Sequence, residues 1–341
     1  MNALVWVANE TMEWEPRPEP VPLPNEVLIQ VKAVGICGSE IEGYLGHNSL
    51  RVPPLIMGHE FCGEIVSLGA EVSTLRAGQK VVVNPLLFCG HCRPCLKGLT
   101  QLCEKRNIIG IHRSGAFGEM VTVPAEAVVP VPDSISPFRA ALAEPLACSL
   151  RATKRAMAGH SLPNVLVFGA GGIGLLCAMA ARILGASKIV IVDRNPDRLA
   201  MTKRLGLGEV VNSAVEDIRV RAGELFGDEG IDVVIDAAGF QDTRETSVRM
   251  LNSGGTLMNI GLGIDDTSLP LNHLTRQEIT ILGSFCYSRE DFNDAVALLV
   301  SGRITEEGWT EIRPLSEGGG AFADLVSGRV HHGKIILDPA Q

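Results

Sequence analysis

Four cysteines are the strongest chemical signal in the sequence. Cys89, Cys92, Cys95 and Cys103 are separated by two, two and seven residues, so their thiolates can surround one tetrahedral zinc ion. A zinc ion with four protein ligands has no open position, which predicts a structural site. One alternative is a [4Fe–4S] cluster, whose usual run closes after three residues and a proline. Another is a nucleic-acid zinc ribbon, which the net charge of −9 disfavours.

A second set of metal-binding residue types is dispersed along the chain. Cys37 lies in Gly-Ile-Cys-Gly-Ser, His59 and Glu60 lie in Gly-His-Glu, and Glu144 lies in Ala-Glu-Pro-Leu. A catalytic zinc needs three protein ligands and one open position, and a cysteine, a histidine and a carboxylate would satisfy this need. These residues are spread from position 37 to position 144, so their spacing alone does not bring them together.

A glycine-rich turn indicates a dinucleotide site. The apolar stretch 165–168 runs into Gly-Ala-Gly-Gly-Ile-Gly at 169–174, and a stretch rich in Ala, Leu and Met follows. Between a strand and a helix, this G-x-G-x-x-G pattern allows a tight turn, close approach of a pyrophosphate and close helix packing. The N–H groups at the helix N-terminus then favour the phosphates. A glycine-rich turn in another α/β fold is the alternative interpretation.

Asp193 is expected to select the cofactor. It ends the apolar run 189–192, where a carboxylate can accept hydrogen bonds from the ribose hydroxyls of adenosine and repel a 2′-phosphate. This favours NAD over NADP, although the neighbouring Arg194 could accommodate that phosphate. Asp193 could alternatively be the N-cap of the following helix.

Apolar periodicity divides the chain into two kinds of segment. Residues 1–149 are rich in short strands, and prolines at every second position from 16 to 24 indicate an extended connection. Residues 150–287 alternate strands with helices, which predicts a doubly wound parallel sheet. The strands are expected at 3–7, 27–31, 63–68, 80–84, 118–123, 128–131, 165–168, 188–192, 210–211, 233–236, 256–260, 279–283 and 334–337. The helices are expected at 150–158, 173–184, 196–205, 243–251 and 289–301.

The composition narrows the class of protein. A length of 341 residues favours two domains, and 46% hydrophobic with 20% charged residues is ordinary for a globular protein. The acidic net charge and the lack of a Lys/Arg run disfavour a nucleic-acid or anionic-membrane partner. The uncharged stretch 165–181 falls just short of a membrane span. Clustered cysteines without a signal-peptide pattern indicate metal binding in a reducing compartment, so we expect a cytoplasmic location.

Taken in order, these motifs resemble the zinc-dependent medium-chain alcohol dehydrogenase family. The similarity covers nearly the whole chain and is to the branch of sorbitol, threonine, butanediol and sugar-alcohol-phosphate dehydrogenases. It implies an α/β protein with two domains. Residues 1–149 and 288–341 would form a GroES-like β-rich catalytic domain with a zinc lobe at about 86–106, and residues 150–287 would form a Rossmann NAD-binding domain.

The resemblance also implies roles for individual residues and two zinc ions per chain, one catalytic and one structural. Cys37 and His59 would bind the catalytic zinc, with Glu60 as a third ligand or alternating with Glu144. Ser39 would hydrogen-bond the alcohol oxygen and begin a proton relay. The residues implied to touch the cofactor are Gly169, Gly171, Gly172, Ile173, Gly174, Asp193, Arg198, Ile260, Gly261 and Leu262.

The chain departs from the family pattern after Ser39. Glu42 occupies the place of the usual relay histidine, so the proton could pass to Glu42, to His47 or directly from the cofactor ribose to water. Within Gly-His-Glu-Phe-Cys-Gly-Glu-Ile, Cys62 is interpreted as a small core residue of a strand, since Cys37 already supplies a thiolate, and Glu64 is given no metal role.

The resulting expectation is a zinc-dependent enzyme that transfers hydride from a polyol, a sugar alcohol or another secondary alcohol to NAD. The alternatives are a threonine-like amino-alcohol dehydrogenase, a sugar-alcohol-phosphate dehydrogenase, and a non-enzymatic NAD-binding regulatory protein that keeps the fold. The only expected partners are the small-molecule substrate and further copies of the chain, as a homotetramer or a dimer.

Overall fold

The computed structural model describes residues 1–341, which form two compact units. The first unit contains Met1–Pro145, Ser288–Val330 and Lys334–Gln341, and the second contains Leu146–Tyr287 and His331–Gly333. The chain passes from the first unit to the second within helix α4 (Ala143–Met157).

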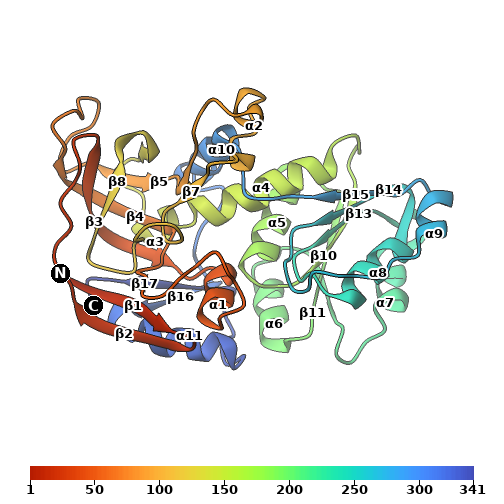
Figure 1. Cartoon of the computed structure of the whole chain (residues 1–341). Helices are drawn as coiled ribbons and strands as arrows, with labels where there is room; N and C mark the ends of the chain where they lie inside the picture. The colour runs from red at the N-terminus through yellow and green to blue at the C-terminus, as the bar shows by residue number, and fades with distance from the viewer. The chain divides into compact units, whose positions relative to one another are not determined.

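A seven-stranded sheet organises the first unit, with the order β16-β17-β3-β4-β5-β9 and with β8 paired to β3 (Figure 1). A separate antiparallel hairpin joins β1 (Asn2–Ala8) to β2 (Thr11–Pro16). All pairs in the larger sheet are antiparallel except β16–β17. Its strands are β3 (Glu26–Gly35), β4 (Glu60–Leu68), β5 (Lys80–Val83), β8 (Met120–Pro124), β9 (Val128–Pro130), β16 (Thr310–Pro314) and β17 (Lys334–Asp338).

Aromatic side chains fill the core of the first unit. Phe322, on α11 (Gly318–Val326), is fully buried and meets Phe117 edge-on with ring centroids 5.9 Å apart. Its ring also lies 5.2 Å from that of Tyr44, at the end of α1 (Gly38–Tyr44). Aromatic pairs at these separations stabilise a core beyond the area that they bury. They tie α1, which follows Cys37, to the C-terminal part of the unit.

The second unit is built on six parallel strands in the order β12-β11-β10-β13-β14-β15, which is the order of a Rossmann sheet. Because strands and helices alternate, the carboxyl ends of all six strands lie at one edge, where such sheets bind ligands. The strands are β10 (Asn164–Phe168), β11 (Lys188–Asp193), β12 (Glu209–Asn212), β13 (Ile231–Asp236), β14 (Leu251–Asn259) and β15 (Thr280–Gly283). The helices are α5 (Gly172–Ile183), α6 (Pro196–Arg204), α7 (Ile218–Phe226), α8 (Gln241–Met250) and α9 (Leu271–Arg276).

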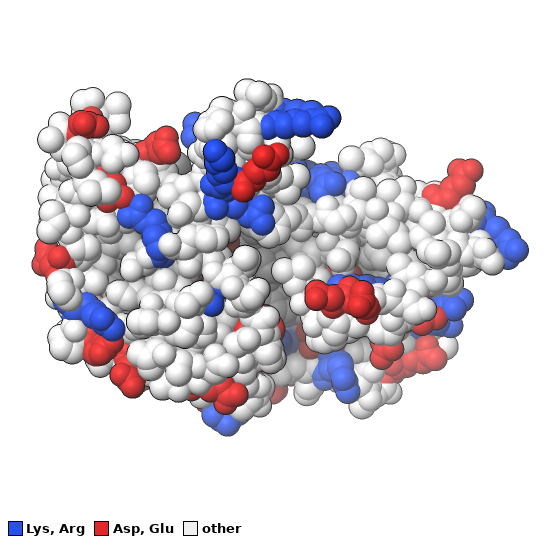
Figure 2. Space-filling model, viewed as in Figure 1, with Lys and Arg blue, Asp and Glu red and all other residues white.

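The remaining elements are short, apart from α10 (Arg289–Val300). The four cysteines lie among β6 (Leu86–Leu87), α2 (Arg93–Leu96) and η1 (Thr100–Leu102), next to β7 (Asn107–Ile108). The others are α3 (Pro137–Ala140), η2 (Ala125–Ala127), η3 (Gly227–Glu229) and η4 (Leu315–Glu317). None of the helices has the length and apolar character needed to cross a bilayer. On the face drawn in Figure 2, acidic and basic side chains are interspersed, and neither sign forms a large patch.

The predicted elements with regular periodicity are confirmed within a few residues, and those of the dinucleotide region match closely. One prediction was wrong at a place that matters: the helix expected at 150–158 begins at Ala143, so Glu144 lies in its first turn. Helix α1 was not predicted, although Glu40 three residues after Cys37 forms a capping box with it. Gly35 and Gly38 lie on either side of Cys37, and glycine is a poor helix former, so the local sequence does not indicate that a helix starts there.

Candidate functional site

The zinc lobe brings its four sulfur atoms together. The Sγ atoms of Cys92 and Cys95 lie 3.4 Å apart, those of Cys103 and Cys89 lie 3.6 Å apart, and those of Cys92 and Cys103 lie 3.9 Å apart. A tetrahedral zinc with bonds of about 2.3 Å places its sulfur ligands about 3.8 Å apart, so the four thiols fit the ion. The cysteines form no disulfide.

The local backbone also favours thiolates in this lobe. A backbone hydrogen bond from His91 lowers the pKa of the Cys89 thiol to about 6. The N–H groups of Cys89 and Lys105 both donate to the Sγ of Cys103, at 3.3 Å each. Such N–H···S contacts disperse thiolate charge, as the ligands of a structural zinc require.

The dispersed residues also come together. Ligand atoms of Cys37, His59 and Glu60 all lie within 4.8 Å of one another in the first unit. Cys37 precedes α1, while His59 and Glu60 stand where β4 begins beside the end of β3. Gly58 adopts φ +97°, and a Cβ there would lie 2.7 Å from the backbone nitrogen of Phe117, so only glycine fits before His59.

The buried carboxylate of Glu40 holds two of these three residues in place. Its Oε2 accepts from the backbone N–H of Cys37 at 2.9 Å, and its Oε1 accepts from the N–H of Gly58 at 2.8 Å. Oε1 also lies 2.8 Å from Nδ1 of His59. With Nδ1 as the donor to this carboxylate, Nε2 carries the lone pair that a metal binds.

A lysine from the far end of the sequence completes the group. Lys334 begins β17, and its Nζ forms an ion pair with Oε2 of Glu60, both side chains being buried. Burial lowers the pKa of Lys334, but the charges of Glu60, Cys37 and Glu144 more than offset this and raise it. A Cβ on Gly35 would lie 2.3 Å from Oε2 of Glu60 and 2.9 Å from Cε of Lys334, so the pair passes directly over this glycine.

Arg51 is the second buried cation beside this group. Its Nη1 donates to the carbonyl of Ser39 at 2.9 Å, and its Nη2 donates to Oγ of Ser39 at 3.1 Å. Burial raises the pKa of the Glu40 carboxyl, but His59 and, to a smaller extent, the charge of Arg51 outweigh burial and lower it. Arg51 uses one lone pair of the Ser39 oxygen, and the hydroxyl donates to Cys37 Sγ at 3.4 Å, so the second lone pair is left to accept a hydrogen bond.

The charges of the group suit a divalent cation. Three carboxylates, those of Glu40, Glu60 and Glu144, are buried here beside the thiol of Cys37, and Lys334 and Arg51 supply two positive charges. Burial lowers the pKa of His59, but Glu40 and Cys37 outweigh that effect and raise it well above its usual value, so a proton on His59 supplies the third positive charge when no metal is bound. A zinc ion with its two charges would replace this proton and would stabilise a thiolate at Cys37.

Several predicted residues lie outside the cluster. Glu144 is buried in the first turn of α4 and is not among the three residues whose ligand atoms meet, although its charge acts on Lys334. Cys62 is fully buried in β4, and burial raises the pKa of its thiol to about 12, whereas Glu64 is exposed. Glu42 and His47 pair with each other at 3.2 Å, and both are at least half exposed.

The glycine turn of the second unit has the geometry of a phosphate cradle. Gly169 follows β10 with φ +99°, and a Cβ on Gly174 would lie 1.8 Å from the carbonyl oxygen of Gly169. Both positions therefore require glycine. Gly171 is the N-cap of α5, which starts at Gly172 and includes Ile173, so the free N–H groups of this helix face the turn.

Asp193 ends β11 beside this turn. Its Oδ2 accepts from the N–H of Ala170 at 2.6 Å, and its Oδ1 accepts from the N–H of Asn195 at 2.8 Å. The suggestion that Asp193 caps the next helix is wrong, because Asn195 caps α6 by accepting from two backbone N–H groups. Arg198 lies on α6 near the turn, Nη1 being 4.0 Å from a Cβ built on Gly171.

The third predicted contact region follows β14 at the same edge of the sheet. The N–H groups of Ile260 and Gly261 donate to the carbonyl of Asp236, at 3.1 Å and 2.8 Å. Leu262 is 78% exposed, so its side chain is available to a ligand.

Comparison with known proteins settles the family. Residues 23–133 match the alcohol dehydrogenase GroES-like domain, and residues 172–301 match the zinc-binding dehydrogenase model. The chain is 37% identical over 308 residues to L-galactonate-5-dehydrogenase of Escherichia coli K12, which covers 90% of this chain and 89% of that protein. The chain belongs to the zinc-containing medium-chain alcohol dehydrogenase family. It is therefore a zinc-dependent alcohol dehydrogenase, and the alternative of a non-enzymatic binding protein falls away.

Two further similarities extend over almost the whole enzyme. L-threonine 3-dehydrogenase of Chelativorans sp. BNC1 is 35% identical over 351 residues, which covers 99% of this chain and 98% of that protein. A protein of Sinorhizobium meliloti 1021, described as a zinc-binding dehydrogenase and solved with NADP, superposes with a TM-score of 0.91 at 28% identity, covering 99% of both chains. The expected fold, a GroES-like domain with a parallel six-stranded Rossmann sheet, is confirmed.

Sequence reasoning missed Glu40, Arg51 and Lys334. Glu40 could have been found, because a glutamate three residues after a helix N-cap is a capping-box signal. Arg51 and Lys334 carry no local signal, since one precedes a proline pair and the other begins an ordinary apolar strand.

Replacing Cys37 by Ser should remove one zinc ion and leave the other. Metal analysis should fall from about two to about one zinc per chain, because the four-cysteine lobe does not involve Cys37. Cys62→Ser is the matched control, since this thiol lies three residues from His59 and should leave both ions bound. Unchanged zinc in Cys37→Ser, or a loss in Cys62→Ser, would contradict the assignment.

Proposed function

We propose that this enzyme oxidises the secondary alcohol of a polyol or sugar-derived substrate with NAD. The observation that carries the proposal is the group of Cys37, His59 and Glu60, which offers three ligands of the kinds that a catalytic zinc uses. Cys37, His59 and Glu60 would hold a zinc ion that supplies Lewis-acid polarisation of the alcohol oxygen, and bound NAD would supply the hydride acceptor. Its relatives include L-galactonate-5-dehydrogenase, whose substrate is sugar-derived, which supports this substrate class.

The surrounding residues divide the remaining work. Glu40 orients His59, and Lys334 holds the carboxylate of Glu60, which keeps Glu60 available as a third ligand with Glu144 as its alternative. Ser39 is the proton acceptor next to the alcohol oxygen in our proposal, and Arg51 fixes its orientation. Beyond Ser39, we propose that the exposed pair of Glu42 and His47, whose side chains lie 3.2 Å apart, passes the proton to water.

Threonine-like amino alcohols are the second candidate substrates. The specific support is the 35% identity to an L-threonine 3-dehydrogenase over 99% of this chain. Sugar-alcohol phosphates are a further expected class within the same branch of the family.

A substrate screen tests the proposal directly. Zinc-replete enzyme is incubated with NAD and panels of polyols, sugar acids, secondary alcohols, amino alcohols and sugar-alcohol phosphates, and NADH is followed by its absorbance. The largest kcat/KM is expected among the polyols and sugar acids. A preference for threonine would favour the second candidate, and no turnover of any alcohol would contradict both.

Asp193 carries the proposed preference for NAD. Asp193→Asn keeps an acceptor oxygen but removes the charge that repels a 2′-phosphate, so the ratio of kcat/KM for NAD to that for NADP should fall by about 10- to 100-fold. Asp228→Asn, at an exposed position outside this edge, should leave the ratio unchanged. A wild-type enzyme that prefers NADP would refute the ribose argument.

We also propose that the enzyme is a homo-oligomer in the cytoplasm, built from dimers that pair through β15. This strand ends the sheet order, bonds only to β14 and exposes most of its residues, Ile281 being 38% exposed. An uncovered edge strand invites pairing with another copy. Nine free cysteines, four of them in the zinc lobe, suit a reducing compartment.

A charge on the edge strand tests the assembly. Ile281→Lys should shift the mass measured by light scattering toward the monomer, because a lysine on an edge opposes strand pairing. Val215→Lys, at a position 79% exposed, is the control and should keep the wild-type mass. An oligomer that is unaffected by Ile281→Lys would place the interface elsewhere.

A further inference from the structure

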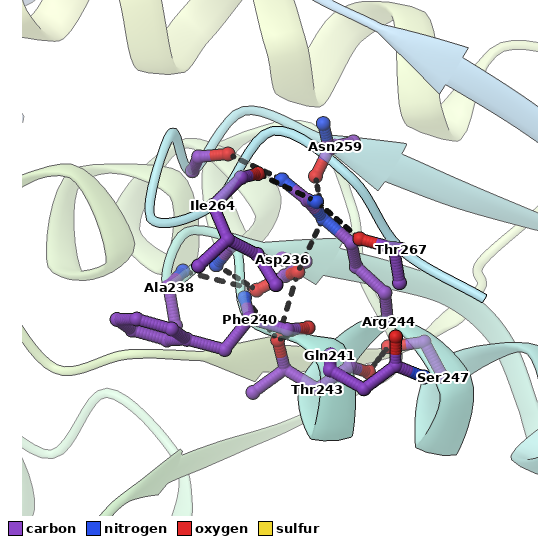
Figure 3. Close-up of polar contacts among 12 residues, drawn as sticks. Asp236, Ala238, Phe240, Gln241, Thr243, Arg244, Ser247, Asn259, Ile264 and Thr267 are labelled. Atoms are coloured by element: carbon purple, nitrogen blue, oxygen red, sulfur yellow. Dashed lines mark hydrogen bonds and ion pairs between the residues drawn. The ribbon is translucent and has the colours of Figure 1, made fainter.

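Arg244 is a nearly buried arginine of the second unit that the zinc and phosphate sites do not use. It lies on α8 and is only 8% exposed. Its guanidinium reaches four acceptors on or after β14 (Figure 3). These are Oδ1 of Asn259 at 3.1 Å, the carbonyls of Gly261 at 3.3 Å and Ile264 at 2.9 Å, and Oγ1 of Thr267 at 2.5 Å.

The fully buried carboxylate of Asp236 is the counter-charge of this arginine. Its Oδ2 lies 3.9 Å from Nε of Arg244 and accepts from Oγ1 of Thr243 at 2.9 Å. Its Oδ1 accepts from the N–H groups of Ala238 and Gly239, at 3.0 Å and 2.8 Å, as Figure 3 shows. One buried ion pair therefore links the turn after β13 to the loop after β14.

The turn after β13 and the loop after β14 lie closer together than side chains at their glycines would allow. A Cβ on Gly239, where φ is +79°, would lie 2.4 Å from the carbonyl oxygen of Gly261. A Cβ on Gly261 would lie 2.6 Å from the carbonyl carbon of Ala238. The N–H of Ile264 also donates to the carbonyl of Gly239 at 3.0 Å. The loop consequently rests on the first turn through backbone contacts, and Arg244 supplies the side-chain bonds that hold it there.

We propose that Arg244 is a positioning residue for the nicotinamide half of the cofactor. It holds the segment from Gly261 to Thr267, which includes the exposed Leu262, in the shape that receives this half. The inference rests on the proposed dinucleotide site. It follows from the placement of both connections at the carboxyl ends of β13 and β14, the ligand-binding edge of a parallel sheet.

The effect should be confined to one half of the cofactor. Asp193 ends β11, which is separated from β14 by β10 and β13. We call Arg244 and its four acceptors the Arg244 clasp. With neighbouring strands about 4.8 Å apart, this clasp and the proposed ribose site are about 14 Å apart across the sheet. ADP-ribose, which lacks nicotinamide, therefore serves as a probe of the half that Arg244 does not position.

The experiment compares NADH and ADP-ribose binding by calorimetry in wild type and Arg244→Gln. The dissociation constant for NADH should rise about 10- to 100-fold, because charged hydrogen bonds that shape the loop are lost, and that for ADP-ribose should change by less than about twofold. Arg244→Lys keeps the charge beside Asp236 and should recover part of the NADH affinity. Arg249→Gln, an exposed arginine on the same helix paired with Glu245, is the matched control and should bind both ligands normally.

Thr267→Val covers the case in which Arg244→Gln does not fold. It removes one acceptor of the clasp without stranding the buried guanidinium, and it should weaken NADH alone by about 3- to 10-fold. Equal losses for NADH and ADP-ribose, or no loss of NADH affinity in a folded variant, would overturn the inference. Wild-type protein that binds neither ligand would instead refute the proposed dinucleotide site.

Discussion

The compensation of buried carboxylate charge is the constraint on which the catalytic half of this enzyme depends. Glu40, Glu60 and Glu144 are buried in the first unit beside the thiol of Cys37. Two buried cations, Lys334 and Arg51, compensate part of this charge, and the raised pKa of His59 allows a proton there to compensate the rest. A zinc ion bound by Cys37, His59 and Glu60 would take the place of that proton.

Each cation acts through one partner. Lys334 holds Glu60, and Arg51 holds Ser39, so the two side chains nearest to the proposed chemistry are oriented from opposite ends of the sequence. Glu40 does the same for His59 and for the backbone of Cys37. Ligands held in this way lose little further freedom when the metal binds, which is the benefit of supporting residues around a metal site.

In the second unit, the ligand-binding edge of the sheet depends on glycines that let backbone segments approach closely. Gly169 and Gly174 allow the tight turn between β10 and α5, while Gly239 and Gly261 let the turn after β13 and the loop after β14 touch through their backbones. The latter contact needs Arg244 and Asp236, because a loop without regular structure leaves carbonyls that a buried donor must satisfy. The glycine turn and the Arg244 clasp both lie at the carboxyl edge of the same sheet, which is the edge where parallel sheets of this strand order bind ligands.

The sequence by itself determined the parts of this protein whose members are neighbours in the chain. The four-cysteine lobe and the glycine turn are set by short spacings, because the backbone geometry of a few residues decides which atoms can meet. Most strands and helices followed from periodicity for the same reason. The grouping of Cys37 with His59 and Glu60 was expected only from family resemblance, and tertiary structure alone brought in Arg51, Lys334 and the Arg244 clasp. A lone charged residue in an apolar segment looks like any surface residue until packing removes its water, and only then does its partner become necessary.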